Sequence, residues 1–354
     1  MGDSFRLRST PQTPDQSHGP GILHALEEFE SHIHSDLDER PDRPPIIDPN
    51  SPQSKGRRTL TWKEIPSWQQ DNEFILTGYR RIQYNWRGCA ASIFGYLHNE
   101  TVNIHSHLAG ALLFCWILAT FREQYFAHYV STNWIDTTVF TIFLISAVLC
   151  LSFSAFYHTC AVHSKEVASR CNALDYAGIV VLIVGSFFPC IYYGFFCEAH
   201  IQFIYLSAIS IAGLGAAYIV LNPEYRKPSH RGARTKVFIA LGLCGIVPVL
   251  HGLITHGFHK LCVEMGFGWL VTSGILYING ALLYANRIPE RFAPGVFDYF
   301  AASHQIFHLH VVLAALAHYW CIITAFDHWH SHDPLSTMEV LTDMHSARGH
   351  KVPP

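Results

Sequence analysis

The chain has 354 residues, of which 49% are hydrophobic, 14% aromatic and only 14% charged. Soluble proteins carry about 25% charged residues, so this composition predicts a membrane protein. The formal net charge of -3 and the lack of a basic patch interleaved with aromatic residues argue against a nucleic-acid partner. The ten cysteines include no C-x-x-C pair, so the sequence indicates neither a zinc ribbon nor a disulfide framework.

In chain order, a polar segment and a mixed segment precede a series of apolar ones. Residues 1–60 are rich in Pro, Ser, Asp and His without periodic apolar positions, which is typical of a disordered tail. Residues 61–99 mix aromatic and charged residues at near-helical spacing, and we interpret them as a juxtamembrane segment with a helix on the membrane surface. Seven apolar segments follow, each close to the about 20 residues that cross a bilayer. They cover residues 104–121, 135–157, 174–196, 201–221, 236–255, 267–285 and 300–325, within a transmembrane domain of residues 100–325 that precedes a tail at 326–354.

Lysine and arginine are distributed unevenly between the two ends of these segments. Nine follow the second, fourth and sixth segments, whereas two follow the first, third and fifth. Because basic loops stay on the cytoplasmic side, we expect a cytoplasmic N-terminus and an outside or lumenal C-terminus. The predicted fold is therefore an all-α integral membrane protein, a seven-transmembrane helix bundle in the plasma membrane or an endomembrane. The nine residues are Lys165, Arg170, Arg226, Lys227, Arg231, Arg234, Lys236, Arg287 and Arg291, and the two are Arg122 and Lys260.

Two histidines stand four residues apart near the start of the seventh segment. This spacing places the imidazoles of His304 and His308 on one helix face, which is half of a metal site. The pattern is similar to the zinc-protease signature H-E-x-x-H, but Gln305 occupies the position of the general-base glutamate. A general base would therefore come from another part of the chain.

The predicted topology brings further polar residues to the same cytoplasmic depth. The second segment ends there with Ser154 and His158, again four residues apart, and the third begins with Asp175 and Tyr176. Three histidines from two helices beside a carboxylate are typical of a catalytic zinc centre with three protein ligands and a water. Asp175 would hold or deprotonate that water, and Ser154 would hydrogen-bond to it or to a substrate carbonyl.

The first segment starts at the same level with Glu100, Asn103 and His107. These residues, with Tyr176, would surround the metal ligands; for Glu100 and Asn103, helix capping and packing is the favoured alternative. His318 lies about 15 Å deeper than His308, which favours a structural role. Four glycines of the apolar segments are expected to allow close helix approach: Gly178, Gly185, Gly213 and Gly215.

Five motifs between residues 62 and 325 carry a family resemblance. They are E-T-V-N-I-H-S-H-L at 100–108, S-A-F-Y-H at 154–158, L-D-Y-A-G-I at 174–179, R-I-P-E-R-F-A-P-G at 287–295 and S-H-Q-I-F-H at 303–308. Together they resemble the progestin and adipoQ receptor family, which is related to haemolysin III, and within it the adiponectin-receptor branch.

The resemblance implies a seven-helix bundle with zinc held by His158, His304 and His308 near the cytoplasmic face. It also implies that Asp175 and Ser154 attend the water at the zinc, and that some members hydrolyse the amide of ceramide-like sphingolipids. An extracellular protein ligand is a further expectation from the receptor members, but neither tail indicates which ligand this would be.

Three functions are consistent with these residues. The first is a zinc-dependent hydrolase of a ceramide-like membrane lipid, coupled to receptor signalling, with the substrate in an apolar cavity between helices. The second is a non-catalytic receptor in which zinc is structural and an outside ligand shifts the conformational population. The third is a protein of zinc or lipid homeostasis. Zinc transport is disfavoured because no chain of ionisable residues continues through the membrane from the ligands.

Overall fold

The computed structural model describes residues 56–225 and 228–331, and all of these belong to one structural unit. The predicted disordered tail at 1–60 and the predicted tail at 326–354 therefore lie for the most part outside the described residues. The same holds for Arg226 and Lys227, two of the nine basic residues used to predict the topology.

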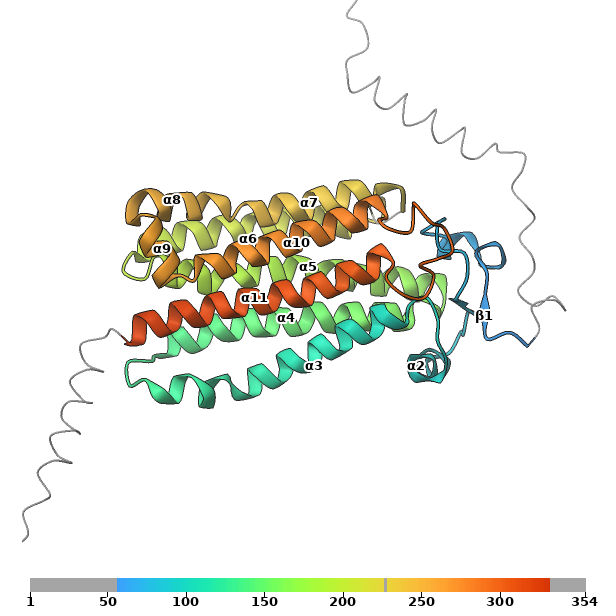
Figure 1. Ribbon diagram of the computed structural model, residues 1–354, viewed down its shortest axis with the longest axis horizontal. Coiled ribbons are helices and arrows are strands. Elements are labelled where there is room, and N and C mark those ends of the chain that lie inside the picture. Colours follow the sequence, from blue (N-terminus) through green and yellow to red (C-terminus); the bar gives the residue numbers. More distant parts are fainter. Residues whose placement is uncertain (1–55, 226–227, 332–354) are drawn as a thin grey trace, which may run out of the picture. The chain divides into compact units, whose positions relative to one another are not determined.

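Seven helices of the described part are long and apolar enough to cross a membrane. They run lengthwise beside one another (Figure 1), which confirms the predicted all-α bundle of seven spans. The fifth span is formed by two consecutive helices that meet at Cys244 and Gly245. The helices are α3 (Thr101–Gln124), α4 (Trp134–Cys160), α5 (Lys165–Gly194), α6 (Ala199–Leu221), α7 (Arg231–Leu243) with α8 (Ile246–His256), α10 (Phe267–Asn286) and α11 (Ser303–Ser331).

Several helices extend beyond the apolar segments predicted from the sequence. Helix α5 begins at Lys165 rather than at residue 174, and α11 continues to Ser331, so residues 326–331 are helical rather than part of a tail. Hydropathy detects only the part of a helix that lies in hydrocarbon. The backbone continues its hydrogen-bonded ladder into polar residues until a capping group ends it, as Ser164 does at the start of α5.

A small sheet and a short helix precede the first span. Strand β1 (Thr59–Leu60) pairs antiparallel with β2 (Tyr79–Arg80). These are the only strands in the described residues, 56–225 and 228–331. Helix α2 (Trp86–Gly95) is seen end-on in Figure 1, so it lies across the direction of the spans, with Trp86 and Phe94 exposed. This is the orientation expected of a helix on a membrane surface. The remaining elements are η1 (Trp62–Glu64), η2 (Ser67–Gln69), η3 (Phe126–His128), η4 (Pro228–His230) and α9 (Phe258–Glu264).

Arg80 connects the small sheet to the end of α4. Its guanidinium donates to the carbonyl oxygens of His158 and Thr159 and, at 2.8 Å, to the hydroxyl of Ser92. The last carbonyls of a helix have no partner within it, and a buried cation satisfies both their hydrogen bonds and the negative end of the helix dipole. Arg80 therefore holds the backbone of the helical turn that carries His158.

The central helices of the bundle are α4 and α11. In each of these two helices, 56% of the most apolar stretch is buried inside the protein, compared with 11% of the corresponding stretch in α10. Their contact contains edge-to-face aromatic rings, including Phe140 and Phe326 with centroids 5.5 Å apart. The three histidines that the sequence singles out thus lie on the two best-packed spans.

Glycine allows three of the predicted close helix contacts. A Cβ at Gly178 of α5 would lie 2.9 Å from the Cα of Cys150 in α4, and a Cβ at Gly185 or Gly213 would also collide with a neighbour. These three predictions are confirmed. The prediction for Gly215 is wrong, because no atom of the described residues lies within 4 Å of its Cβ position. Sequence alone does not distinguish Gly213 from Gly215, which are two residues apart on one helix and hence on different faces.

Gly178→Ala is expected to destabilise the protein by about 1–3 kcal/mol, because the added methyl group must push the backbone of α4 away from α5. The measurement is thermal unfolding of the purified protein in detergent. Gly215→Ala is the matched control, since its methyl group enters open space. Equal melting temperatures for the two variants would contradict the proposed backbone contact.

Candidate metal centre

Three histidines from two helices converge at the end of the bundle near α2. Candidate ligand nitrogens of His158, His304 and His308 all lie within 4.8 Å of one another. Their ring centroids form a nearly equilateral triangle with sides of 4.9, 4.8 and 4.8 Å, and the rings are inclined to each other by 61–88°. The structure thus brings together the three residues that the sequence proposed as ligands.

Hydrogen bonds orient two of these rings. His158 donates from Nδ1 to Oε2 of Glu100 over 2.7 Å, and His308 donates from Nδ1 to the carbonyl oxygen of Asn103 over 3.1 Å. In each ring, Nε2 is then the nitrogen with the free lone pair. Nε2 of His158 is buried and has no hydrogen-bond partner in the described part of the chain. A carboxylate or carbonyl behind a histidine is the usual arrangement that fixes the tautomer of a metal ligand.

The local sequence explains how α11 presents its two histidines. They occupy the first two turns, and Glu290 caps the helix by accepting the backbone N–H of Ser303 at 2.7 Å. Gln305, at the position of a protease glutamate, is buried and points elsewhere. Its side chain donates to the carbonyl oxygens of Asn99 and Tyr299. Gln305 therefore anchors the preceding loop.

The residues present fit a zinc ion. The site offers imidazole nitrogens, which are good zinc ligands in their neutral form, and His158 and His308 are buried, with exposures of 2% and 1%. A nitrogen without a partner is costly in such surroundings unless it binds something. Three protein ligands with one open direction match catalytic zinc sites, whereas closed structural sites use four.

Asp175 of α5 and Ser154 of α4 lie next to each other and beside the histidines. Both are buried, and the serine hydroxyl approaches the carboxylate. Both also line the cavity that His304 and His308 border. The carboxylate is therefore placed to exchange a proton with a molecule in the cavity near the metal centre.

The cavity has a volume of about 900 Å³ and runs along the inside of the bundle. Apolar side chains of α5, α7, α8 and α10 form most of its wall, and polar groups gather where the histidines stand. Ligand pockets typically measure about 300–1,000 Å³, so this cavity is large enough for a lipid chain. Tyr176 also lines it, with its ring 4.9 Å from the Arg234 guanidinium.

Glu100 and Asn103 contact the metal centre, which corrects the preference for capping and packing. Glu100 accepts hydrogen bonds from both His158 and the side-chain amide of Asn103, the latter at 2.7 Å. Their spacing of three residues at the start of α3 allows this pair, but the sequence does not show that His158 would lie opposite. His318, by contrast, donates to the Ser186 carbonyl oxygen at 3.0 Å, in line with the structural role predicted for it.

Two further residues near the site were not found from the sequence. Arg80 holds the end of α4, and Arg231 lies over the ring of Tyr284, which in turn contacts the His304 ring at 4.9 Å. In the sequence, the positive charge of these two arginines indicated only how the chain is oriented in the membrane. No sequence pattern marks these buried arginines, because their partners, which include backbone carbonyls, a ring and the Asp71 carboxylate, come from other segments of the chain.

Glu100→Gln is expected to weaken metal binding about 10- to 100-fold, because the neutral amide polarises His158 less than the carboxylate does. Competition with a chelator of known affinity measures the effect. Glu166→Gln, at an exposed position in the first turn of α5, is the control. The same metal affinity in both variants would show that Glu100 does not support the ligand.

Comparison with known proteins places the chain in a family. The model of the haemolysin-III-related family matches residues 95–319. An adiponectin receptor protein of Drosophila melanogaster is 42% identical over 73% of this chain, and a progestin and adipoQ receptor-like protein of Caenorhabditis elegans is 40% identical over 75%. An ADIPOR-like receptor of Saccharomyces cerevisiae is 38% identical over 77% of the chain.

The matched part spans 57% of the fly protein, 60% of the nematode protein and 85% of the yeast protein. The family model covers the first six spans, the seventh span as far as residue 319, and every residue of the candidate metal centre. The chain therefore belongs to the haemolysin-III-related family of progestin and adipoQ receptors, in its adiponectin-receptor branch, and is a multi-pass integral membrane protein.

Proposed function

We propose that the protein is a zinc-dependent hydrolase of a ceramide-like lipid amide, coupled to receptor signalling. The observation that carries this proposal is that His304, His308 and Asp175 lie on the wall of one cavity of about 900 Å³, while the nitrogens of His158 converge with those of the two wall histidines. A structural metal requires no such cavity. A hydrolase of a membrane lipid requires one that is apolar along its length and polar at the reacting bond.

Different residues of the chain would have different roles in amide hydrolysis. Zinc bound by the histidines would act as a Lewis acid on the amide carbonyl and would make water more acidic. Asp175 would orient the attacking water and accept its proton, and would pass a proton to the departing amine nitrogen. A C–O bond forms and the C–N bond breaks, giving a fatty acid and an amine. Ser154 would steady the carboxylate, and the apolar wall would hold the acyl chain and exclude bulk water.

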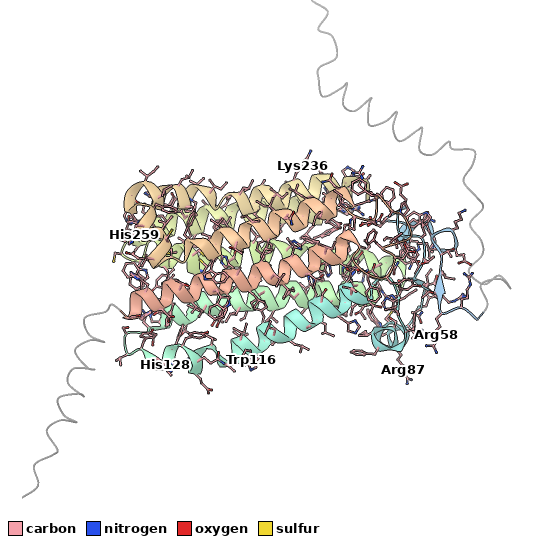
Figure 2. The ribbon with its side chains drawn as sticks, in the orientation of Figure 1. Arg58, Arg87, Trp116, His128, Lys236 and His259 are labelled. Carbon is pink, nitrogen blue, oxygen red and sulfur yellow. The ribbon has the colours of Figure 1, made fainter. Side chains whose placement is uncertain are left out.

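We propose further that the metal centre faces the cytoplasm and that the N-terminus lies on that side. The distribution of charge supports this orientation. Arg58 and Arg87 lie at the end of the bundle that carries β1 and α2, and His128 and His259 lie at the opposite end (Figure 2). The helix ends that carry Lys165 and Arg231 belong to the former end (Figure 1).

A receptor with structural zinc is the second candidate. Its support is that the centre joins the ends of α4 and α11 and, through Glu100, the start of α3, so a metal would tie three helix ends together. The fly, nematode and yeast relatives are named as receptors. An outside protein ligand could then act by shifting the population of bundle conformations.

The deciding experiment is to purify the protein in mild detergent, measure bound metal by elemental analysis and follow fatty-acid release from a ceramide with and without a chelator. About one zinc per chain and release that the chelator abolishes are expected. Zinc without release would favour the receptor with structural zinc. A protein without bound metal after expression in zinc-supplied cells would contradict both candidates.

A further inference from the structure

His107 is a buried histidine beside the metal centre that the proposed reaction does not yet use. It lies on α3, is 3% exposed and borders the same cavity as His304 and His308. Its ring stacks on the ring of His308, with centroids 3.6 Å apart and an angle of 8° between the planes. Neither of its ring nitrogens makes a hydrogen bond to any of the residues that the structure describes.

The stacking prevents His107 from being a fourth ligand of the same ion. A metal bound to an imidazole lies in the ring plane, about 2.0–2.1 Å from the nitrogen. The planes of His107 and His308 are nearly parallel and about one ring thickness apart, so one ion cannot lie in both. His107 is also not among the histidines whose nitrogens converge within 4.8 Å.

The two free nitrogens of His107 distinguish it from other buried histidines of the described bundle. His158, His308 and His318 each have at least one ring nitrogen hydrogen-bonded to a carboxylate or a carbonyl. A buried donor or acceptor that is left unpaired loses its hydrogen bonds to water without replacement, which destabilises the folded state. Packing alone would be served better by an apolar ring of the same shape, so a partner from the cavity is needed.

The chemistry of a neutral imidazole specifies this partner. It presents one N–H donor and one nitrogen acceptor. A hydroxyl group also donates and accepts, so it can pair with either nitrogen, and it has the size to fit beside a stacked ring. We propose that His107 binds a hydroxyl group on the amine side of the lipid amide, which makes the site selective for N-acylated amino alcohols over N-acylated alkylamines.

This inference rests on the proposed function, since it assumes a lipid amide with its carbonyl at the histidine triangle. The acyl chain then lies along the apolar wall of α5 and α10, and the amine side of the molecule lies next to α3. His107 acts there as a binding residue that sets specificity; it is not assigned a role in bond cleavage.

The test uses His107→Phe, which keeps an aromatic ring on His308 and removes both nitrogens. The probes are a ceramide and an N-acyl alkylamine with the same chains but no hydroxyl groups. We expect the wild type to prefer the ceramide by about tenfold or more in kcat/KM, because an unmatched polar group disfavours the analogue. The variant is expected to lose this preference while it keeps its metal content.

A binding measurement separates this inference from the proposed function. Thermal stabilisation of the metal-loaded protein by each lipid reports binding whether or not hydrolysis occurs. Stronger stabilisation by the ceramide in the wild type, lost in His107→Phe, supports the inference even if no fatty acid is released. An unchanged preference in the variant, or equal binding of both lipids by the wild type, would overturn it. Loss of metal from His107→Phe would also overturn it, by making His107 part of the metal centre.

Discussion

Replacing His304 and His308 together by alanine is expected to abolish metal binding and to lower the melting temperature by roughly 10 °C. Two of the three nitrogens of the triangle disappear, and one remaining imidazole cannot hold zinc at the concentrations found in cells. A metal present at a thousandfold its Kd contributes about 4 kcal/mol to folding stability. For a domain of this size, about 1 kcal/mol corresponds to 2–4 °C. Elemental analysis and thermal unfolding in detergent measure the two effects.

Two controls separate metal loss from damage to the core. His310→Ala removes a histidine of the same helix that bonds to the Ile306 carbonyl oxygen and to Asn279, away from the centre, and it should keep the metal. A chelator should lower the melting temperature of the wild type to that of the double variant and should not affect the variant further. A double variant that retains a full complement of metal would refute the assignment of the ligands.

Asp175→Asn is expected to keep the metal and to reduce amide hydrolysis at least a hundredfold. The histidine triangle does not include Asp175, so binding of the ion does not depend on the carboxylate. An amide of the same shape can still accept a hydrogen bond from Ser154, but it cannot take a proton from water, and general-base catalysis typically contributes about 10²–10⁴-fold. The measurements are metal content and the rate of fatty-acid release.

The matched control for this prediction is Asn172→Ala. Asn172 lies one turn earlier on α5 and lines the same cavity. Its replacement therefore tests whether removing any polar side chain from this part of the cavity wall slows the reaction. Hydrolysis by Asp175→Asn at the wild-type rate would remove Asp175 from the mechanism. Loss of metal from Asp175→Asn would instead make the carboxylate a ligand or its essential support.

The spacing of residues along the chain predicted much of this protein. Seven apolar segments of about 20 residues predict seven spans, because no shorter helix crosses the hydrocarbon and no unpaired backbone survives in it. The four-residue spacing of His304 and His308 predicts that both lie on one face, since an α-helix returns to the same face after about one turn. The alternation of the spans then brings His158 to the same end of the bundle.

Contacts between distant segments were not predictable in this way. The hydrogen bond from His158 to Glu100 joins residues 58 positions apart, and the stack of His107 on His308 depends on how α3 rotates against α11. Nothing in the local sequence specifies that rotation, because it results from the packing of all side chains between the helices.

The sequence by itself thus determined the number of spans, their alternation and the faces that carry the histidines. These features follow from local backbone geometry and from the thickness of the bilayer. Only the tertiary structure decided which nitrogens converge, which carboxylate supports them, and that a cavity lies beside them. Those properties depend on differences of an ångström or so in interhelical packing, where one methyl group, as at Gly178, decides whether two helices touch.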